Sequence, residues 1–226
     1  MSKFDGTLDG ITGRGAGGLR TMRTSPILDQ AMRYWSSLRE GTDLPRRAAL
    51  DPRAMRHVIG HAMILDRVHN GAIRARLGGH VMNDLMGMDV RGLPVRAFFD
   101  LRDRDRAVEL VTQVFETPAS LEMDLLSEGP TGTLLTGRML FLPLLDGAGA
   151  PTKALSVLVT DRVVTDPPRR FGITNATMVP FATASARPTP QLHVAHEMDL
   201  PVEIAHAASA EPEMRPSSVP WLRIVK

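Results

Sequence analysis

Hydrophobic and polar residues alternate at the start of the segment 72–92, and this alternation predicts a strand with one buried face. The residues expected on that face are Ile73, Ala75 and Leu77. Gly78 and Gly79 follow, at a point where the backbone must turn sharply or approach another segment closely, because they carry no Cβ atoms. Helical spacing comes next, so the segment predicts a concave wall of backbone and methionine, which suits ligand binding.

The same periodicities predict an α+β domain over residues 25–164. Helices are expected at about 26–40, 52–59 and 101–117, and strands at about 61–67, 72–78, 121–125, 134–145 and 153–161. The strand at 134–145 is apolar on both faces, so something must cover each face of the sheet, and the helix at 26–40 is the expected cover for the second. The strand at 121–125 alternates with acidic residues and is expected to show one face to water.

Weak periodicity marks the two ends of the chain. Residues 1–24 are rich in Gly, Thr and Arg and are expected to be flexible. Residues 165–226 hold about half of the 17 prolines, which predicts a partly ordered C-terminal extension. Within it, the segments 170–179 and 221–225 could form short strands or lie extended along the domain.

The amino-acid composition argues against several classes of function. The chain has 226 residues, of which 43% are hydrophobic and only 4% aromatic, so 13 methionines help to fill one adaptable core. A net charge of +2 with interspersed Arg and acidic residues argues against nucleic-acid binding. The absence of cysteine excludes disulfides, thiolate nucleophiles and a cysteine-linked flavin, and it fits a reducing compartment. No apolar run is long enough to span a bilayer, so we expect a cytoplasmic protein.

Candidate metal ligands are few. His57 and His61 stand four residues apart, but Gly60 lies between them without an acidic residue, so capping or surface roles are favoured over a metal site. A second cluster, formed by His193, His196 and Glu197, falls in the C-terminal extension, and no metal site is predicted there either.

Two aromatic residues on the first predicted helix have two possible packing partners. Tyr34 and Trp35 lie near its apolar stripe with Leu38, and they could pack on the domain's own sheet or on a partner subunit.

Several short motifs are more specific than the order of elements. They are TyrTrp at 34–35, LeuProArgArg at 44–47, ArgLeuGlyGly at 76–79, LeuMetGlyMetAspValArgGly at 85–92 and LeuProLeu at 142–144. Together with the element order over about 26–161, they resemble the bacterial PAS-like family first catalogued as a domain of unknown function. The resemblance implies a five-stranded antiparallel sheet with helices on one face, a cavity between them, and a sensory or regulatory role. PAS domains that hold haem do so through a His on the long helix, and residues 101–117 contain none, so haem is not expected and any cofactor is unknown.

On such a fold, a ligand in the cavity would meet an apolar lining with one imidazole. The expected lining is Met63, Leu65, Leu77, His80, Met86, Phe98, Met139 and Phe141. His80 could face the ligand, or it could serve as a helix N-cap or a buried hydrogen-bond partner.

The sequence therefore favours a non-enzymatic regulatory module that binds a small apolar or amphipathic ligand, a protein partner, or both. Homodimerisation is expected through the helix at 26–40, with Tyr34, Trp35 and Leu38 at the interface. One rival hypothesis is an enzyme on a cone-shaped α+β fold, with His80 as general base oriented by Asp84 or Asp89. Another is a purely structural scaffold.

Overall fold

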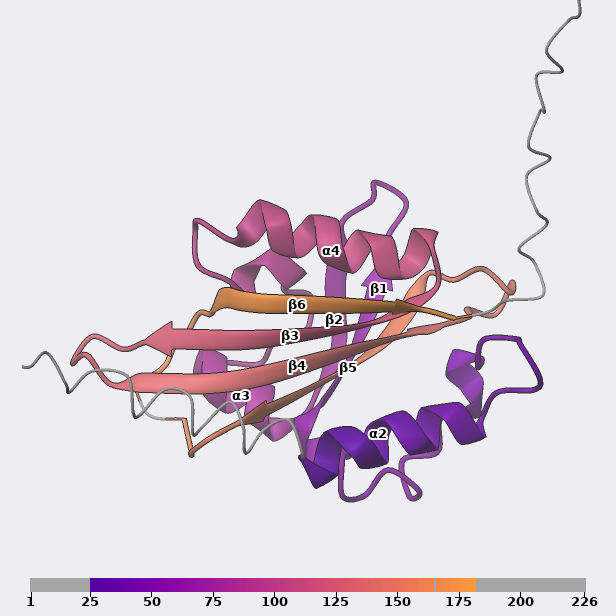
Figure 1. Ribbon diagram of the computed structural model, residues 1–226, viewed down its shortest axis with the longest axis horizontal. Coiled ribbons are helices and arrows are strands. Elements are labelled where there is room, and N and C mark those ends of the chain that lie inside the picture. Colours follow the sequence, from indigo (N-terminus) through magenta and orange to yellow (C-terminus); the bar gives the residue numbers. More distant parts are fainter. Residues whose placement is uncertain (1–24, 165, 182–226) are drawn as a thin grey trace, which may run out of the picture. The chain divides into compact units, whose positions relative to one another are not determined.

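A computed structural model describes residues 25–164 and 166–181 as an α+β domain built on one antiparallel sheet (Figure 1). Its strands are β1 (Ala62–Arg67), β2 (Ile73–Gly78), β3 (Ala119–Glu128), β4 (Leu134–Leu144), β5 (Lys153–Thr160) and β6 (Gly172–Pro180). Within these residues the sheet order is β2-β1-β5-β4-β3-β6, and each neighbouring pair is antiparallel. The predicted α+β class and antiparallel sheet are confirmed. The sheet has a sixth strand beyond the expected five, because the segment 170–179 forms β6 and pairs with β3. Of the two alternatives left open for this segment, the short strand is confirmed.

Helices cover both faces of this sheet. The α-helices are α2 (Pro26–Ser37), α3 (His80–Met86) and α4 (Arg104–Glu116), and the 3-10 helices are η1 (Arg47–Ala49), η2 (Ile59–His61) and η3 (Val95–Phe98). We call the face that packs against α3, η3 and α4 the inner face, and the opposite face, which packs against α2, the outer face. Figure 1 shows α4 and α2 on opposite sides of the sheet, so the predicted cover by the first helix is confirmed.

The inner core is formed by alternate residues of the central strands. Leu121 and Met123 of β3 and Met139 of β4 point to this side, where they meet buried side chains of α4 such as Val111 and Phe115. Burying a side chain of this size stabilises a fold by about 1.5–3 kcal/mol, so this cluster supplies much of the driving force for folding.

The outer core is anchored by Trp35, which is completely buried. Its indole Nε1–H donates a hydrogen bond to the carbonyl oxygen of Pro143 in β4 at 2.9 Å, and its ring packs on Phe181 with the centroids 4.6 Å apart. Trp35 thus packs on the domain's own sheet, the first of the two alternatives left open by the sequence.

Two predicted helices are shorter or looser than expected. The helix at 26–40 ends at Ser37, whose hydroxyl donates to the carbonyl oxygen of Tyr34 and so competes with helical bonding. The segment 52–59 forms turns that lead into η2, because the Asp51 carboxylate accepts a hydrogen bond from the Arg53 N–H and makes a tight turn at its start.

The strand expected to show one face to water shows that face only in part: the side chain of Glu122 is 43% exposed, but Asp124 is buried. Asp124 of β3 is only 5% exposed, because β6 pairs along one side of the strand and Arg138 of β4 reaches its carboxylate. The prediction is wrong at Asp124, since an ion pair with Arg138 satisfies this carboxylate where water was predicted.

Candidate functional site

A β-bulge in β2 redirects the end of the strand toward the outer face. Ala75 pairs with Leu65 of β1, but Leu77 pairs with the adjacent Ile64, so Arg76 is an extra residue. An extra residue reverses the face on which the following side chains lie. Leu77 is therefore 50% exposed on the outer side, and the prediction that it shares the buried face of Ile73 and Ala75 is wrong.

The paired glycines at the end of β2 allow two segments to approach closely. A Cβ atom on Gly79 would lie 2.3 Å from the carbonyl oxygen of Gly60 and 2.4 Å from that of Ile59. A Cβ atom on Gly78 would lie 2.3 Å from a methyl carbon of Val90. Gly79 itself has φ −69°, which any residue can adopt, so its requirement is for space. The close approach predicted at this corner is confirmed.

We expect Gly79→Ala to lower the free energy of unfolding by about 1–3 kcal/mol, because rigid backbone atoms would have to move. Gly60→Ala should cost less, because the atoms in its way belong to the exposed imidazole of His80, which can rotate. Gly147→Ala is the matched control, since no atom lies within 4 Å of the added carbon. Urea unfolding of the three variants measures the difference, and equal stability of Gly79→Ala and Gly147→Ala would contradict this account.

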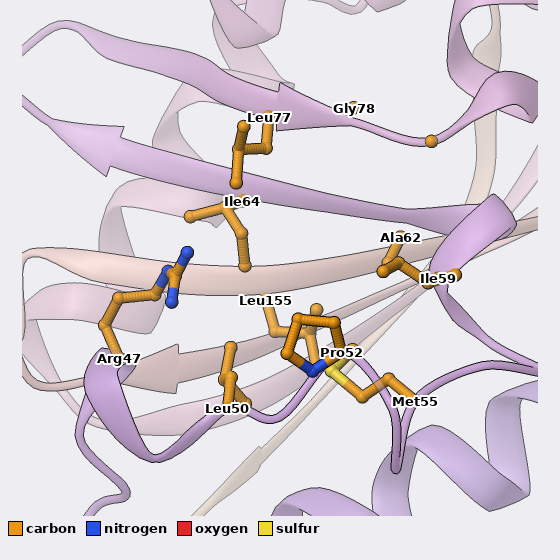
Figure 2. Close-up of a pocket in the computed structure, with 11 residues that line it drawn as sticks. Arg47, Leu50, Pro52, Met55, Ile59, Ala62, Ile64, Leu77, Gly78 and Leu155 are labelled. Carbon is orange, nitrogen blue, oxygen red and sulfur yellow. The ribbon is translucent and has the colours of Figure 1, made fainter.

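A groove opens on the outer face beside this corner, with a volume of about 270 Å³ (Figure 2). Its lining consists of Arg47, Leu50, Pro52, Met55, Ile59, Ala62, Ile64, Leu77, Gly78, Gly79 and Leu155. In Figure 2 the connection that carries Leu50, Pro52 and Met55 forms one wall, and the end of β2 forms the opposite one. We call this site the outer-face groove.

The predicted lining residues separate into two groups. Met63, Leu65, Met86, Phe98, Met139 and Phe141 lie together in the buried inner core, as one packed cluster. Leu77 and His80 do not join them: Leu77 lines the outer-face groove, and His80 is exposed at the start of α3. An inner-face cavity lined by these residues stays a prediction.

His80 lies beside η2 and not in the inner core. Its ring centroid is 6.3 Å from that of His61, whose Nδ1 lies 2.9 Å from the carbonyl oxygen of Leu158. Gly79 occupies the N-cap position of α3, so the N-cap role considered for His80 is excluded.

The acid–base pair of the rival enzyme hypothesis is not assembled in the described part of the chain. No hydrogen bond joins His80 to Asp84 or Asp89 there. Asp89 instead pairs with Arg91 at 2.6 Å, and this side-chain hydrogen bond lowers the pKa of the Asp89 carboxyl. A carboxylate held in this way is not available to orient the imidazole.

Candidate metal ligands do not converge in residues 25–164 and 166–181, where no three His, Cys, Asp or Glu side chains come together. His57 accepts a hydrogen bond from Arg56. The cluster of His193, His196 and Glu197 lies outside the described residues, as do residues 1–24 and 182–226.

A membrane span would need a long apolar helix, and the part of the chain that the structure describes contains none.

A charged cluster borders the outer face at the β1–β5 pairing. Asp66 is 6% exposed and accepts hydrogen bonds from Arg76 Nε at 2.7 Å and from Lys153 Nζ. Burial raises the pKa of Asp66, but the hydrogen bonds from Lys153 and Arg76 outweigh this effect and leave the pKa below its ordinary value. Both cations are therefore matched by an ionised carboxylate within the fold.

Two weak signals in the sequence indicate the groove. Leu50 and Met55 are apolar residues between the first predicted helix and the first predicted strand, and Ile59 precedes Gly60 at the end of this segment. Such residues indicate burial or binding, but only the bulge in β2 brings Leu77 opposite them.

Comparison with known proteins identifies one family and two solved structures. A model of the PAS domain family matches residues 23–159. The PAS domain of a protein from Colwellia psychrerythraea is similar with 16% identity, covering 46% of this chain and 87% of that one, at a TM-score of 0.35. An RNA-binding Light-Oxygen-Voltage receptor is similar with 16% identity, covering 52% of this chain but only 36% of the receptor, at a TM-score of 0.36. The comparison with curated proteins found no match.

Proposed function

The chain belongs to the PAS domain family, and on this premise we propose that it is a sensory or regulatory module that binds a small apolar or amphipathic molecule in the outer-face groove. Binding, and not turnover, is proposed, because the family is sensory in character and His80 has no acidic partner among the described residues. A protein partner would receive the signal.

The observation that carries the proposal is the pair of exposed aliphatic side chains at the groove. Ile59 is 45% exposed and Leu77 is 50% exposed, and both line a groove whose other side chains are nearly all apolar. Exposed apolar surface gathered in a concavity favours an occupant, because covering it removes that surface from water.

The inner face keeps one feature that would suit a polar group of a bound molecule. Ser156 of β5 is completely buried on that face, and its hydroxyl has no hydrogen-bond partner in the described part of the chain. A buried hydroxyl without a partner is costly, which favours water or a ligand atom beside it.

The proposal is tested with the neutral apolar dye N-phenyl-1-naphthylamine, titrated into the full chain and followed by fluorescence. Leu77→Trp fills the groove and is expected to weaken dye binding about tenfold. Leu134→Trp is the matched control, because Leu134 is 49% exposed on a strand but lies outside the groove. Dye binding that survives Leu77→Trp and is changed by Ser156→Ala would place the site on the inner face. No binding to the parent chain would overturn the proposal.

Homodimerisation and a cytoplasmic location stay predictions. Of the three residues expected at the interface, Trp35 is completely buried by the domain itself, whereas Tyr34 and Leu38 are partly exposed. A second copy would therefore contact Tyr34 and Leu38 and reach Trp35 only if α2 moved.

A further inference from the structure

We infer that the molecule bound in the outer-face groove is an amphipathic carboxylate, whose apolar tail lies along the groove and whose head group pairs with Arg47. This inference rests on the proposed function and specifies the ligand class of the same site.

Arg47 is held at one end of the groove by its backbone. It begins η1, and its N–H donates a hydrogen bond to the carbonyl oxygen of Leu145 at 2.8 Å, next to a bridge between Arg46 and Leu145. Figure 2 shows the guanidinium directed from η1 toward the side of the groove formed by Ile64 and Leu77. Its position therefore depends on the end of the central strand β4 and not on a free loop.

The charge of Arg47 is unmatched within the described residues. Its side chain is half-buried, and it makes no hydrogen bond or ion pair in residues 25–164 and 166–181. The nearby cations of the outer face differ, since Arg76 and Lys153 share Asp66. Placing a guanidinium beside apolar side chains without a counter-charge is unfavourable, and an incoming anion would relieve the cost.

The lining also limits the head group of the ligand. Arg47 is the one charged residue among the described residues that line the groove, and no acidic side chain lies with it, which disfavours a cationic head group. The planar guanidinium fork matches a carboxylate with two parallel hydrogen bonds. A single Arg suits a singly charged head group better than a phosphate, which carries more charge and more acceptor oxygens.

The size of the groove limits the tail. A volume of about 270 Å³ lies just below the range of about 300–1,000 Å³ that is usual for small-molecule sites. A short aliphatic chain packed against Ile64, Leu77 and Leu155 fits this volume and leaves the carboxylate at the Arg47 end.

Calorimetric titration of the full chain with octanoate and with octanol tests the inference, because the two probes share a tail and differ in the head group. The parent chain is expected to bind octanoate about tenfold more tightly than octanol at pH 7, where the carboxylate is ionised. Arg47→Met should remove this difference, because the charge that pairs with the carboxylate is lost. Arg46→Met is the matched control on the neighbouring residue, which does not line the groove, and it should preserve the difference.

Each other outcome has a distinct meaning. Equal binding of both probes by the parent chain, or a preference for octanoate that survives Arg47→Met, would overturn the carboxylate assignment and leave the proposed function intact. Binding of neither probe would overturn both. Loss of both probes in Leu77→Trp would support the groove as their common site.

Discussion

Replacing Asp124 by alanine is expected to lower the free energy of unfolding by about 3–5 kcal/mol, because it leaves a buried guanidinium without its main partner. Asp124 accepts hydrogen bonds from Arg138 with an oxygen–nitrogen distance of 2.6 Å, and the two side chains are 7% and 10% exposed. Asn175 of β6 also donates to this carboxylate at 3.3 Å. Without Asp124, the one ion-pair partner left to Arg138 among the described residues would be Glu122 at 3.5 Å, a residue whose side chain is 43% exposed.

Urea unfolding with linear extrapolation measures this loss of stability, and two further variants serve as controls. Asp89→Ala removes an ion pair of similar length whose side chains are 51% and 68% exposed, so it should cost less than about 1 kcal/mol. The double variant Asp124→Leu with Arg138→Met removes both charges together and should recover most of the stability. A loss below about 1 kcal/mol in Asp124→Ala would mean that water reaches Arg138 and that the pair is not insulated.

The sequence predicts the elements of this fold well, because their signals are local. The apolar residues of α4 recur at helical spacing, and β4 and β5 carry apolar residues on both faces, so each could be assigned from its own residues. The order of these elements, together with the short motifs, was sufficient to identify the family.

What the sequence could not supply are the contacts between distant segments. The acidic alternation of β3 is the same whether Asp124 meets water or Arg138, and the choice depends on β6, which pairs with β3 from some fifty residues later. Leu77 follows a regular alternation in sequence, yet a single bulge at Arg76 moves it to the opposite face. The candidate site differs from the predicted one for this reason. The glycine corner lines a hollow, but this hollow lies on the outer face.

The helix that covers the outer face depends on one aromatic anchor, and Trp35→Ala is expected to lower the free energy of unfolding by about 3–5 kcal/mol. The substitution removes a completely buried ring from between α2, Phe181 and the sheet, and it leaves the Pro143 carbonyl oxygen without the indole donor. Urea unfolding measures the total loss. Amide hydrogen exchange should show that protection falls first in α2, because the inner core does not contain Trp35.

Trp35→Phe separates the two contributions of this side chain, since phenylalanine keeps the aromatic contact and loses the hydrogen bond. Its cost should be smaller than that of Trp35→Ala, on the order of 1–3 kcal/mol, which is the usual penalty for leaving a buried acceptor unsatisfied. Ser36→Ala on the exposed side of the same helix is the control and should change stability by less than about 0.5 kcal/mol. If Trp35→Ala proved as mild as Ser36→Ala, α2 would not be fixed to the sheet by this residue. The helix would then be able to detach, and a second copy could reach Trp35.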